Sequence, residues 1–198
     1  MKAFQKIFAL GLFLVSASTM FAAESIPTVR IEKSGSEKKV SVIAEQLTST
    51  ITVEIATKNG FVLETKTSEG ETFAKIFNVE GLEAGSYQVI VLAGTREIIQ
   101  PFTIKNNQLI LNVTDRETYF VPTMKWKNDA LDLMMFNNRL SDVSFRLMDE
   151  RGNTVFEDSM QNVLKVERRY NLDELASGKY VVQVVTPHKA YYKDIVVQ

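Results

Sequence analysis

A stretch that ends in Leu-x-x-Gly-x-Tyr occurs twice in this chain, and it limits the folds that the chain can adopt. Residues 77–87 read FNVEGLEAGSY, and residues 170–180, which lie 93 positions later, read YNLDELASGKY. The two copies share the spacing of large apolar residues, glycine and tyrosine. A repeat of this kind indicates two similar domains in tandem.

Each copy of the stretch predicts a corner between two strands. The aromatic and aliphatic residues at its start lie two positions apart, on one face of a strand, and the leucine then enters the core. We expect the glycine to adopt a backbone conformation that is costly for other residues. The tyrosine resembles the tyrosine corner of immunoglobulin-like sandwiches, in which the ring packs inside and the hydroxyl binds a backbone group upstream. The predicted structural positions are Leu82, Gly85, Tyr87, Leu175, Gly178 and Tyr180.

The first residues of the chain have the layout of a secretory signal peptide. Lys2 and Lys6 precede an apolar run over residues 7–15, and small and polar residues follow it. The run is too short to span a bilayer as a helix, so we expect residues 1–23 to be removed during export. The mature protein is then predicted to be periplasmic, associated with the outer surface, or released.

The composition of the remaining chain excludes several classes of protein. Without Lys2 and Lys6, 21 of the 23 basic side chains remain against 24 acidic ones, so the mature chain has no basic field for nucleic acid. The chain has no cysteine, which excludes disulfides, thiol chemistry and cysteine metal sites. We also expect no transmembrane segment in the mature chain.

The rest of the sequence predicts an all-β fold. Short segments with alternating apolar residues follow one another, Asn59-Gly60 is a strong hairpin signal, and Pro101 predicts an edge strand. We therefore predict two tandem immunoglobulin-like antiparallel β-sandwich domains after a cleavable signal peptide. The predicted domains are residues 24–107 and 108–198, with residues 107–114 either ending the first domain or starting the second.

The second half also resembles a known family. Residues 143–198 are similar to the small β-sandwich domains at the carboxyl ends of proteins exported by the type nine secretion system of Bacteroidota. The matching features are the turn at residues 149–152, the motif around Gly178 and Tyr180, and the last strand at residues 193–197. The whole chain resembles small exported Bacteroidota proteins of unknown function. The resemblance implies that the carboxyl-terminal domain could act as a secretion-sorting module.

Few residues suggest catalysis or metal binding. His188, the only histidine, lies between the last two predicted strands, where we expect an exposed turn residue. Met134 and Met135 are adjacent in a predicted strand and so face opposite sides, which favours core packing over copper ligation. We therefore expect no catalytic residues, no metal ligands, no cofactor and no enzymatic activity.

The best candidate for a binding surface is a group of aromatic residues in the second half. An exposed tryptophan with nearby tyrosines could stack on sugar rings or anchor a protein partner. The alternative is that the tryptophan packs in the second core or at the domain junction. The group consists of Trp126, Tyr119, Tyr191 and Tyr192.

Taken together, these patterns predict an exported binding, adhesion or structural protein of the bacterial cell envelope. Its expected partner is a protein or a glycan, recognised through loops at the sandwich ends or through edge strands. Two alternatives stay open, namely a secretion-sorting module and a carbohydrate-binding module.

Overall fold

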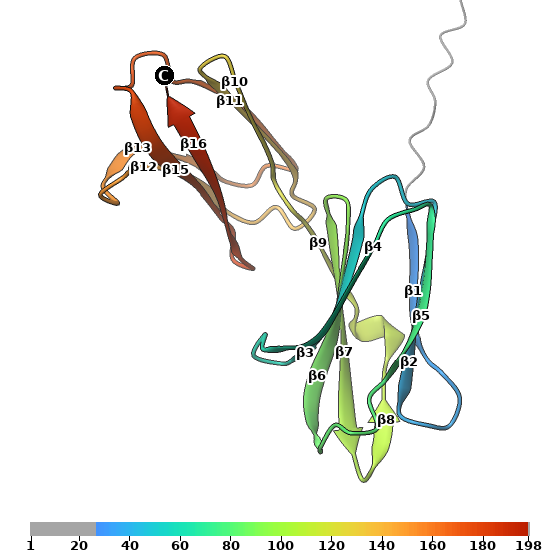
Figure 1. Ribbon diagram of the computed structural model, residues 1–198. Coiled ribbons are helices and arrows are strands. Elements are labelled where there is room, and N and C mark those ends of the chain that lie inside the picture. The colour runs from blue at the N-terminus through green and yellow to red at the C-terminus, as the bar shows by residue number, and fades with distance from the viewer. Residues whose placement is uncertain (1–26, 198) are drawn as a thin grey trace, which may run out of the picture.

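Antiparallel β-strands form nearly all the regular structure (Figure 1). The computed structural model describes residues 27–197, so the predicted signal peptide, residues 1–23, lies outside the described residues. The described part contains one helical element, the short 3-10 turn η1 (Val113–Asp115). It contains no helix of the length and apolar character needed to cross a membrane. The prediction of an all-β chain with two immunoglobulin-like sandwiches is confirmed.

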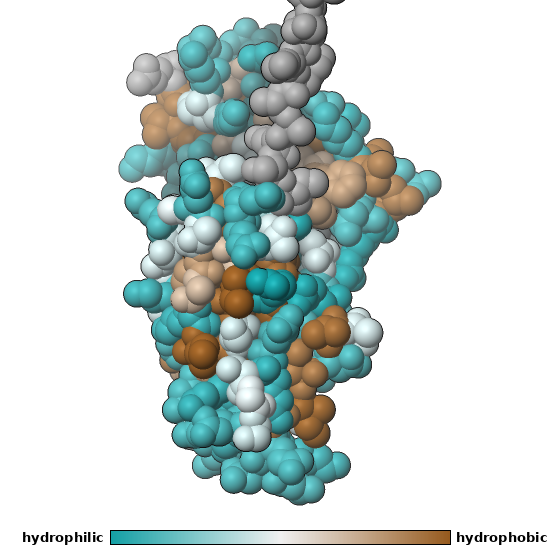
Figure 2. All heavy atoms as spheres, turned by 90° about the vertical axis from the view of Figure 1, so that its right-hand side faces the viewer, coloured by the Kyte–Doolittle hydropathy of each residue, from teal (hydrophilic) through white to brown (hydrophobic). Residues whose placement is uncertain are grey.

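The first sandwich packs a three-stranded sheet against a larger sheet. Its strands are β1 (Thr28–Lys33), β2 (Lys39–Glu45), β3 (Ile51–Thr57), β4 (Val62–Ser68), β5 (Thr72–Asn78), β6 (Gly85–Ala93), β7 (Arg96–Lys105), β8 (Gln108–Ile110) and β9 (Glu117–Phe120). The sheet orders are β1-β2-β5 and β4-β3-β6-β7-β8, and β9 also pairs with β7. Alternate residues point inward, so Ile31, Val42, Phe77 and Val91 meet in a buried core. The side that carries the three-stranded sheet is mostly hydrophilic, with separate hydrophobic spots (Figure 2).

The second sandwich contains seven strands in two sheets. They are β10 (Thr123–Lys127), β11 (Ala130–Phe136), β12 (Val143–Asp149), β13 (Thr154–Met160), β14 (Lys165–Asn171), β15 (Gly178–Val185) and β16 (Ala190–Val197). The sheet orders are β10-β11-β14 and β13-β12-β15-β16. Leu131, Phe145, Val182 and Ile195 belong to its core, together with Met135 and Met160.

The second sandwich repeats strands β1 to β7 of the first, while β8 and β9 have no counterpart in it. The sheet β1-β2-β5 corresponds to β10-β11-β14, and β4-β3-β6-β7 corresponds to β13-β12-β15-β16. A local irregularity is shared as well, because the pairing register shifts between Ile55 and Ala56 in β3 and between Leu147 and Met148 in β12. The repeat in the sequence is therefore a repeat of the seven-strand sandwich.

The repeated stretch forms the corner between β5 and β6 and, in the second domain, between β14 and β15. The Tyr87 hydroxyl donates a hydrogen bond to the Glu83 carbonyl at 3.1 Å, and the Tyr180 hydroxyl donates to the Ala176 carbonyl at 2.8 Å. Both bonds reach four residues upstream, as a tyrosine corner requires. The leucines of the motif pack partly buried against the two cores, Leu82 in the first and Leu175 in the second.

The expected backbone conformation of the corner glycines is wrong. Neither Gly85 nor Gly178 has a positive φ. A Cβ atom on Gly85 would instead lie 3.4 Å from the Tyr87 ring, and one on Gly178 would lie 3.9 Å from Cε2 of Tyr180. In both corners the tyrosine ring thus lies beside the glycine at a distance that is ordinary for a Cβ contact.

The strand that contains Pro101 is an inner strand, which corrects its predicted place at an edge. β7 pairs with β6 on one side and with both β8 and β9 on the other. The β9 ladder covers residues 96–99 and the β8 ladder covers residues 103–105, so Pro101 lies in the gap between them. A residue without an N–H group is accepted there because the outer side of β7 lacks a pairing strand at this point.

The first sheet extends further along the chain than predicted. The predicted division after residue 107 falls between β7 and β8, two strands of one sheet, and β9 belongs to that sheet too. Leu109 is buried in the first core. Residues 107–114 thus end the first domain, which is one of the two placements considered, and the chain leaves this sheet after Phe120.

Because strand β9 runs back along β7, the two sandwiches meet at corresponding ends. β7 starts at Arg96, and β9 runs back beside it until Phe120 pairs with Arg96. β16 starts just after His188, which contacts Glu97 at the start of β7. β7 and β16 are corresponding strands, and both run away from the junction (Figure 1). The domains therefore meet head to head, and the two tyrosine corners lie at the outer ends.

Candidate functional site

The structure separates the four predicted aromatic residues into two pairs. Tyr119 and Tyr191 lie at the junction between the sandwiches, where they line one cleft. Trp126 and Tyr192 lie elsewhere in the second sandwich, on β10 and β16. The four residues do not form one binding surface, so we describe the junction and the β16 edge separately.

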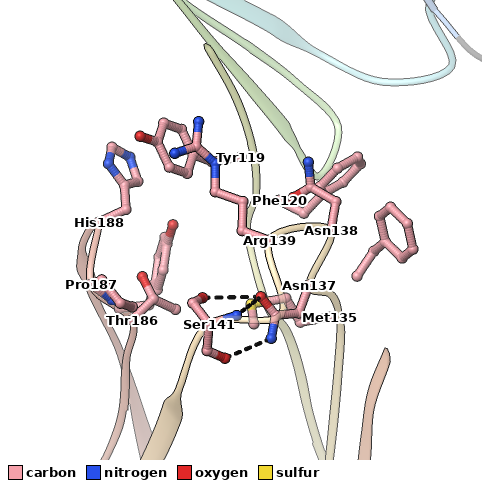
Figure 3. A pocket seen from close by; sticks show the side chains of 12 residues that line it. Tyr119, Phe120, Met135, Asn137, Asn138, Arg139, Ser141, Thr186, Pro187 and His188 are labelled. Atoms are coloured by element: carbon pink, nitrogen blue, oxygen red, sulfur yellow. Dashed lines mark hydrogen bonds between the residues drawn. The ribbon is translucent and has the colours of Figure 1, made fainter. Parts of the chain in front are cut away.

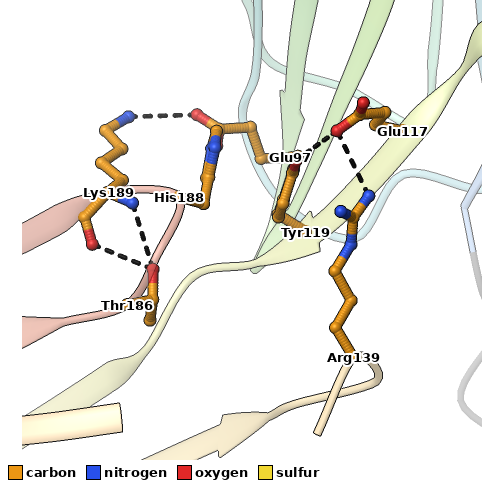
Figure 4. Close-up of polar contacts among 7 residues, drawn as sticks. All are labelled: Glu97, Glu117, Tyr119, Arg139, Thr186, His188 and Lys189. Atoms are coloured by element: carbon orange, nitrogen blue, oxygen red, sulfur yellow. Dashed lines mark hydrogen bonds and ion pairs between the residues drawn. The ribbon is translucent and has the colours of Figure 1, made fainter. Parts of the chain in front are cut away.

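At the junction, a buried carboxylate of the first domain binds two side chains of the second. Glu97 is 5% exposed. One of its oxygens lies 2.7 Å from Nε2 of His188, and the other accepts a hydrogen bond from Nζ of Lys189 at 3.0 Å (Figure 4). A charge is costly to bury unless it is paired and hydrogen-bonded, and both oxygens of Glu97 have such a partner. The three side chains therefore fasten the two domains to each other.

His188 is a junction residue, which corrects its expected place in an exposed turn. Its side chain is 21% exposed, and its ring stacks on Tyr119 with 3.6 Å between ring centres. The turn that carries it is closed by the Thr186 side chain, whose hydroxyl donates to the Lys189 carbonyl at 3.0 Å. His188 points from this turn to Glu97 and Tyr119 of the first domain.

Tyr119 lies between charged groups from both domains. The guanidinium carbon of Arg139 lies 4.2 Å from the centre of the Tyr119 ring, and Arg139 also donates to Glu117 at 3.2 Å. The Tyr119 hydroxyl donates to the same Glu117 carboxylate. This hydrogen bond lowers the pKa of Glu117, while burial and the bond together raise the pKa of Tyr119. The network keeps Glu117 charged and Tyr119 neutral.

A small cleft of about 150 Å³ opens beside this network (Figure 3). It is walled by β9, by the loop between β11 and β12, and by the turn between β15 and β16. Burial, with smaller effects of Glu97 and Tyr119, raises the pKa of Tyr191 in this wall to about 12. The cleft hydroxyl of Ser141 donates to Oδ1 of Asn137 at 3.0 Å, which ties the loop together.

The other aromatic pair belongs to the edge of the second sandwich. Nε1 of Trp126 donates to the carbonyl of Val196 at 3.2 Å, and the partly buried indole packs against the second core. Tyr192 is 61% exposed and accepts a hydrogen bond from Nε2 of Gln183 at 2.8 Å. Trp126 thus joins one sheet to the edge strand of the other. Its surroundings agree with the alternative prediction, in which it packs in the second core.

Sequence patterns alone did not identify Glu97 and Arg139 as junction residues. Glu97 carries a signal in retrospect, since it is a charged residue at the start of an otherwise apolar segment, next to Ile98 and Ile99. Arg139 carries none, because it lies in a polar loop whose composition is ordinary.

The second sandwich matches a known protein family. Residues 127–198 match the model of a family described as the secretion system C-terminal sorting domain. The matched segment begins at the last residue of β10 and continues through β16. The resemblance expected for residues 143–198 is therefore confirmed, and it covers a longer part of the second domain.

Several solved structures are similar to the chain at low sequence identity. The two-domain fibronectin type III segment of chicken tenascin is 8% identical with a TM-score of 0.29, and the match covers 86% of this chain and 97% of that one. The FN1–FN3 domains of chicken CNTN1 are 10% identical with a TM-score of 0.28, over 83% of this chain and 62% of that one. The BSP domain of a biofilm associated protein is 13% identical with a TM-score of 0.29, over 86% of this chain and 29% of that one. The chain thus spans less than two thirds of the last two structures. A comparison with curated proteins found no match.

Proposed function

We propose that this protein is exported to the bacterial cell envelope and that its second sandwich acts as a secretion-sorting module. The observation that carries the proposal is the match of residues 127–198 to the C-terminal sorting domain family. The matched segment covers β11 to β16 of a folded unit that has its own core, and of β10 it includes only the last residue. Such a unit can be recognised as a whole by a secretion apparatus.

The first sandwich provides the natural control for this proposal. It has the same strand order and the same corner motif as the second, yet the family match does not include it. If the sandwich architecture alone directed sorting, either domain would do so. Comparison of the two domains in one assay therefore separates a specific sorting function from a general effect of the fold.

The experiment uses a bacterium that carries this secretion system. One reporter with its own signal peptide is fused to residues 121–198, and a second copy of the reporter is fused to residues 27–120. We expect release of the first fusion to the surface or medium and retention of the second in the periplasm. Equal release of both, or retention of both, would contradict the sorting function.

We further propose that the protein is not an enzyme and that the first sandwich has a binding or structural function. Glu97 and His188 could be two members of a catalytic triad, which also needs a hydroxyl on the free ring nitrogen. The hydroxyls of the neighbouring loops have other partners, since Ser141 donates to Asn137 and Thr186 donates to the Lys189 carbonyl. These contacts support a structural use of the junction.

The geometry does not favour the carbohydrate-binding alternative. A sugar platform needs exposed ring faces in one place. The Tyr119 ring is covered by His188, and Trp126 packs against the second core. Envelope partners of the protein are therefore better sought among proteins than among glycans.

A further inference from the structure

The two sandwiches differ at one corresponding edge. In the first domain, the outer side of β7 is covered by β8 and β9. In the second domain, the corresponding strand β16 ends the sheet order, and no strand in residues 27–197 pairs with its outer side. The same edge is thus paired in one copy and open in the other.

The backbone of β16 presents hydrogen-bonding groups along this open edge. The Val196 carbonyl points outward, because it accepts the indole N–H of Trp126 from the other sheet. In an antiparallel strand, alternate residues direct their N–H and C=O groups to the same side. Tyr192 and Asp194 therefore direct theirs outward too. The Val196 carbonyl is occupied by Trp126, so the groups left for an added strand are those of Tyr192 and Asp194, which no strand of residues 27–197 pairs on that side.

The side chains along the edge define the kind of strand that fits. Tyr192 and Val196 are 61% and 54% exposed, and the exposed carboxylate of Asp194 lies between them. Cross-strand neighbours stabilise a sheet when apolar residues meet and when opposite charges meet. The matching strand has apolar residues opposite Tyr192 and Val196 and a basic residue opposite Asp194.

We propose that β16 binds an extended segment of a partner protein by strand addition, with this apolar–basic–apolar pattern. The proposal rests on the proposed sorting function, for which the partner is a component of the secretion apparatus. The pairing of β9 with the start of β7 is an example, within this chain, of a strand added to the same edge of the sandwich. The positions that correspond to Arg96–Ile99 in the second domain are Lys189, in the turn before β16, and the first three residues of β16.

A second copy of the chain is a poorer occupant. Antiparallel self-pairing of β16 that brings Tyr192 opposite Val196 also brings Asp194 opposite Asp194 of the other copy. Like charges directly opposite each other destabilise a sheet. A basic residue on a different protein removes this conflict.

The first domain suggests the variant that tests the proposal. Pro101 in β7 pairs with Gln88, and Asp194 in β16 pairs with Val181 at the corresponding position. A proline is therefore compatible with the ladder to the inner neighbour at this position, while it removes the outward N–H group. Asp194→Pro blocks the outer ladder, and Asp194→Ala removes only the charge.

The assay measures release of the full-length protein from the same host, together with the melting temperature of each purified variant. We expect Asp194→Pro to melt within a few degrees of the wild type and to lose at least about tenfold in release. Asp194→Ala should retain most of the release, and Asp194→Lys should reduce it further than Ala does, because the charge is reversed. Release of folded Asp194→Pro at the wild-type level would overturn the proposal.

Two further measurements keep the test decisive. If Asp194→Pro fails to fold, Tyr192→Lys replaces it, since this exposed side chain can change without a loss of core packing; unchanged release of that variant would overturn the proposal. A wild-type dimer in solution that Asp194→Pro converts to a monomer would assign the edge to a second copy and contradict the partner proposed here.

The reporter fusion separates the two proposals. If the reporter with residues 121–198 is not released at all, the sorting function is contradicted. If it is released equally with and without Asp194→Pro, only the strand-addition inference is contradicted.

Discussion

At the scale of single residues, the corner motif is explained by ring packing and one hydrogen bond. Tyr180 is 8% exposed, its hydroxyl reaches the Ala176 carbonyl, and its ring lies near Gly178. The motif made these residues recognisable in the sequence. The sequence predicted a glycine needed for its φ angle, but φ at Gly178 is not positive and a Cβ atom there would meet the ring at ordinary contact distance.

This explanation predicts opposite results for two neighbouring substitutions. Tyr180→Phe keeps the ring but leaves the Ala176 carbonyl without its donor, so the free energy of unfolding should fall by about 1 kcal/mol. Gly178→Ala should change it by less than about 0.5 kcal/mol, because the added methyl group meets the ring only at ordinary contact distance and φ is not positive. Urea unfolding of both variants measures the difference. A loss at Gly178→Ala larger than that at Tyr180→Phe would contradict this explanation and show that the corner requires glycine.

At the scale of strands and sheets, local patterns predicted most of the elements. Alternation predicted the strands, and the repeat predicted that the second half would copy the first. The position of β7 within the sheet was not predictable from Pro101, because an edge and a gap between two partner strands accept a proline for the same reason. Which strand lies beside another depends on contacts that are distant in the sequence.

Trp126 connects β10 to β16 across the second sandwich, and its replacement tests this element. Trp126→Ala removes partly buried aromatic packing and the hydrogen bond to Val196, so we expect a loss of roughly 2 kcal/mol in the free energy of unfolding. Trp126→Phe keeps part of the packing and should lose about half as much. Chemical denaturation followed by circular dichroism provides the measurement. Unchanged stability of the alanine variant would return Trp126 to the list of exposed binding residues.

At the scale of the whole molecule, side chains more than ninety positions apart hold the domains in place. Glu97 and His188 are 91 residues apart, and no periodic pattern relates them. For this reason the sequence predicted a folded domain on each side of the junction but neither the junction itself nor the place of His188. The aromatic residues were good candidates for contacts, yet their division between the cleft and the β16 edge depends on the way the domains meet.

The junction predicts a change in domain coupling without a change in either core. Glu97→Ala leaves His188 and Lys189 without their carboxylate, and charge-assisted bonds of this kind contribute about 1.5–3 kcal/mol. We expect small-angle X-ray scattering to give a larger radius of gyration and calorimetry to resolve two unfolding transitions that move apart. Lys39→Ala, at an ion pair with Glu37 beside the tyrosine-corner end of the first sandwich, serves as the control and should leave both measurements unchanged. A Glu97→Ala protein with the scattering profile of the wild type would contradict a fastening role for this carboxylate.

The return strand β9 also determines how such a protein can grow by duplication. When repeated domains are joined tail to head, each new copy offers the next one the same docking end, and the array can lengthen without limit. Here β9 reverses the direction of the chain, so the end of the first sandwich at Glu97 contacts the corresponding end of the second sandwich at His188. A third copy would have to contact one of the outer ends, where the tyrosine corners lie. The duplication has therefore produced a closed pair.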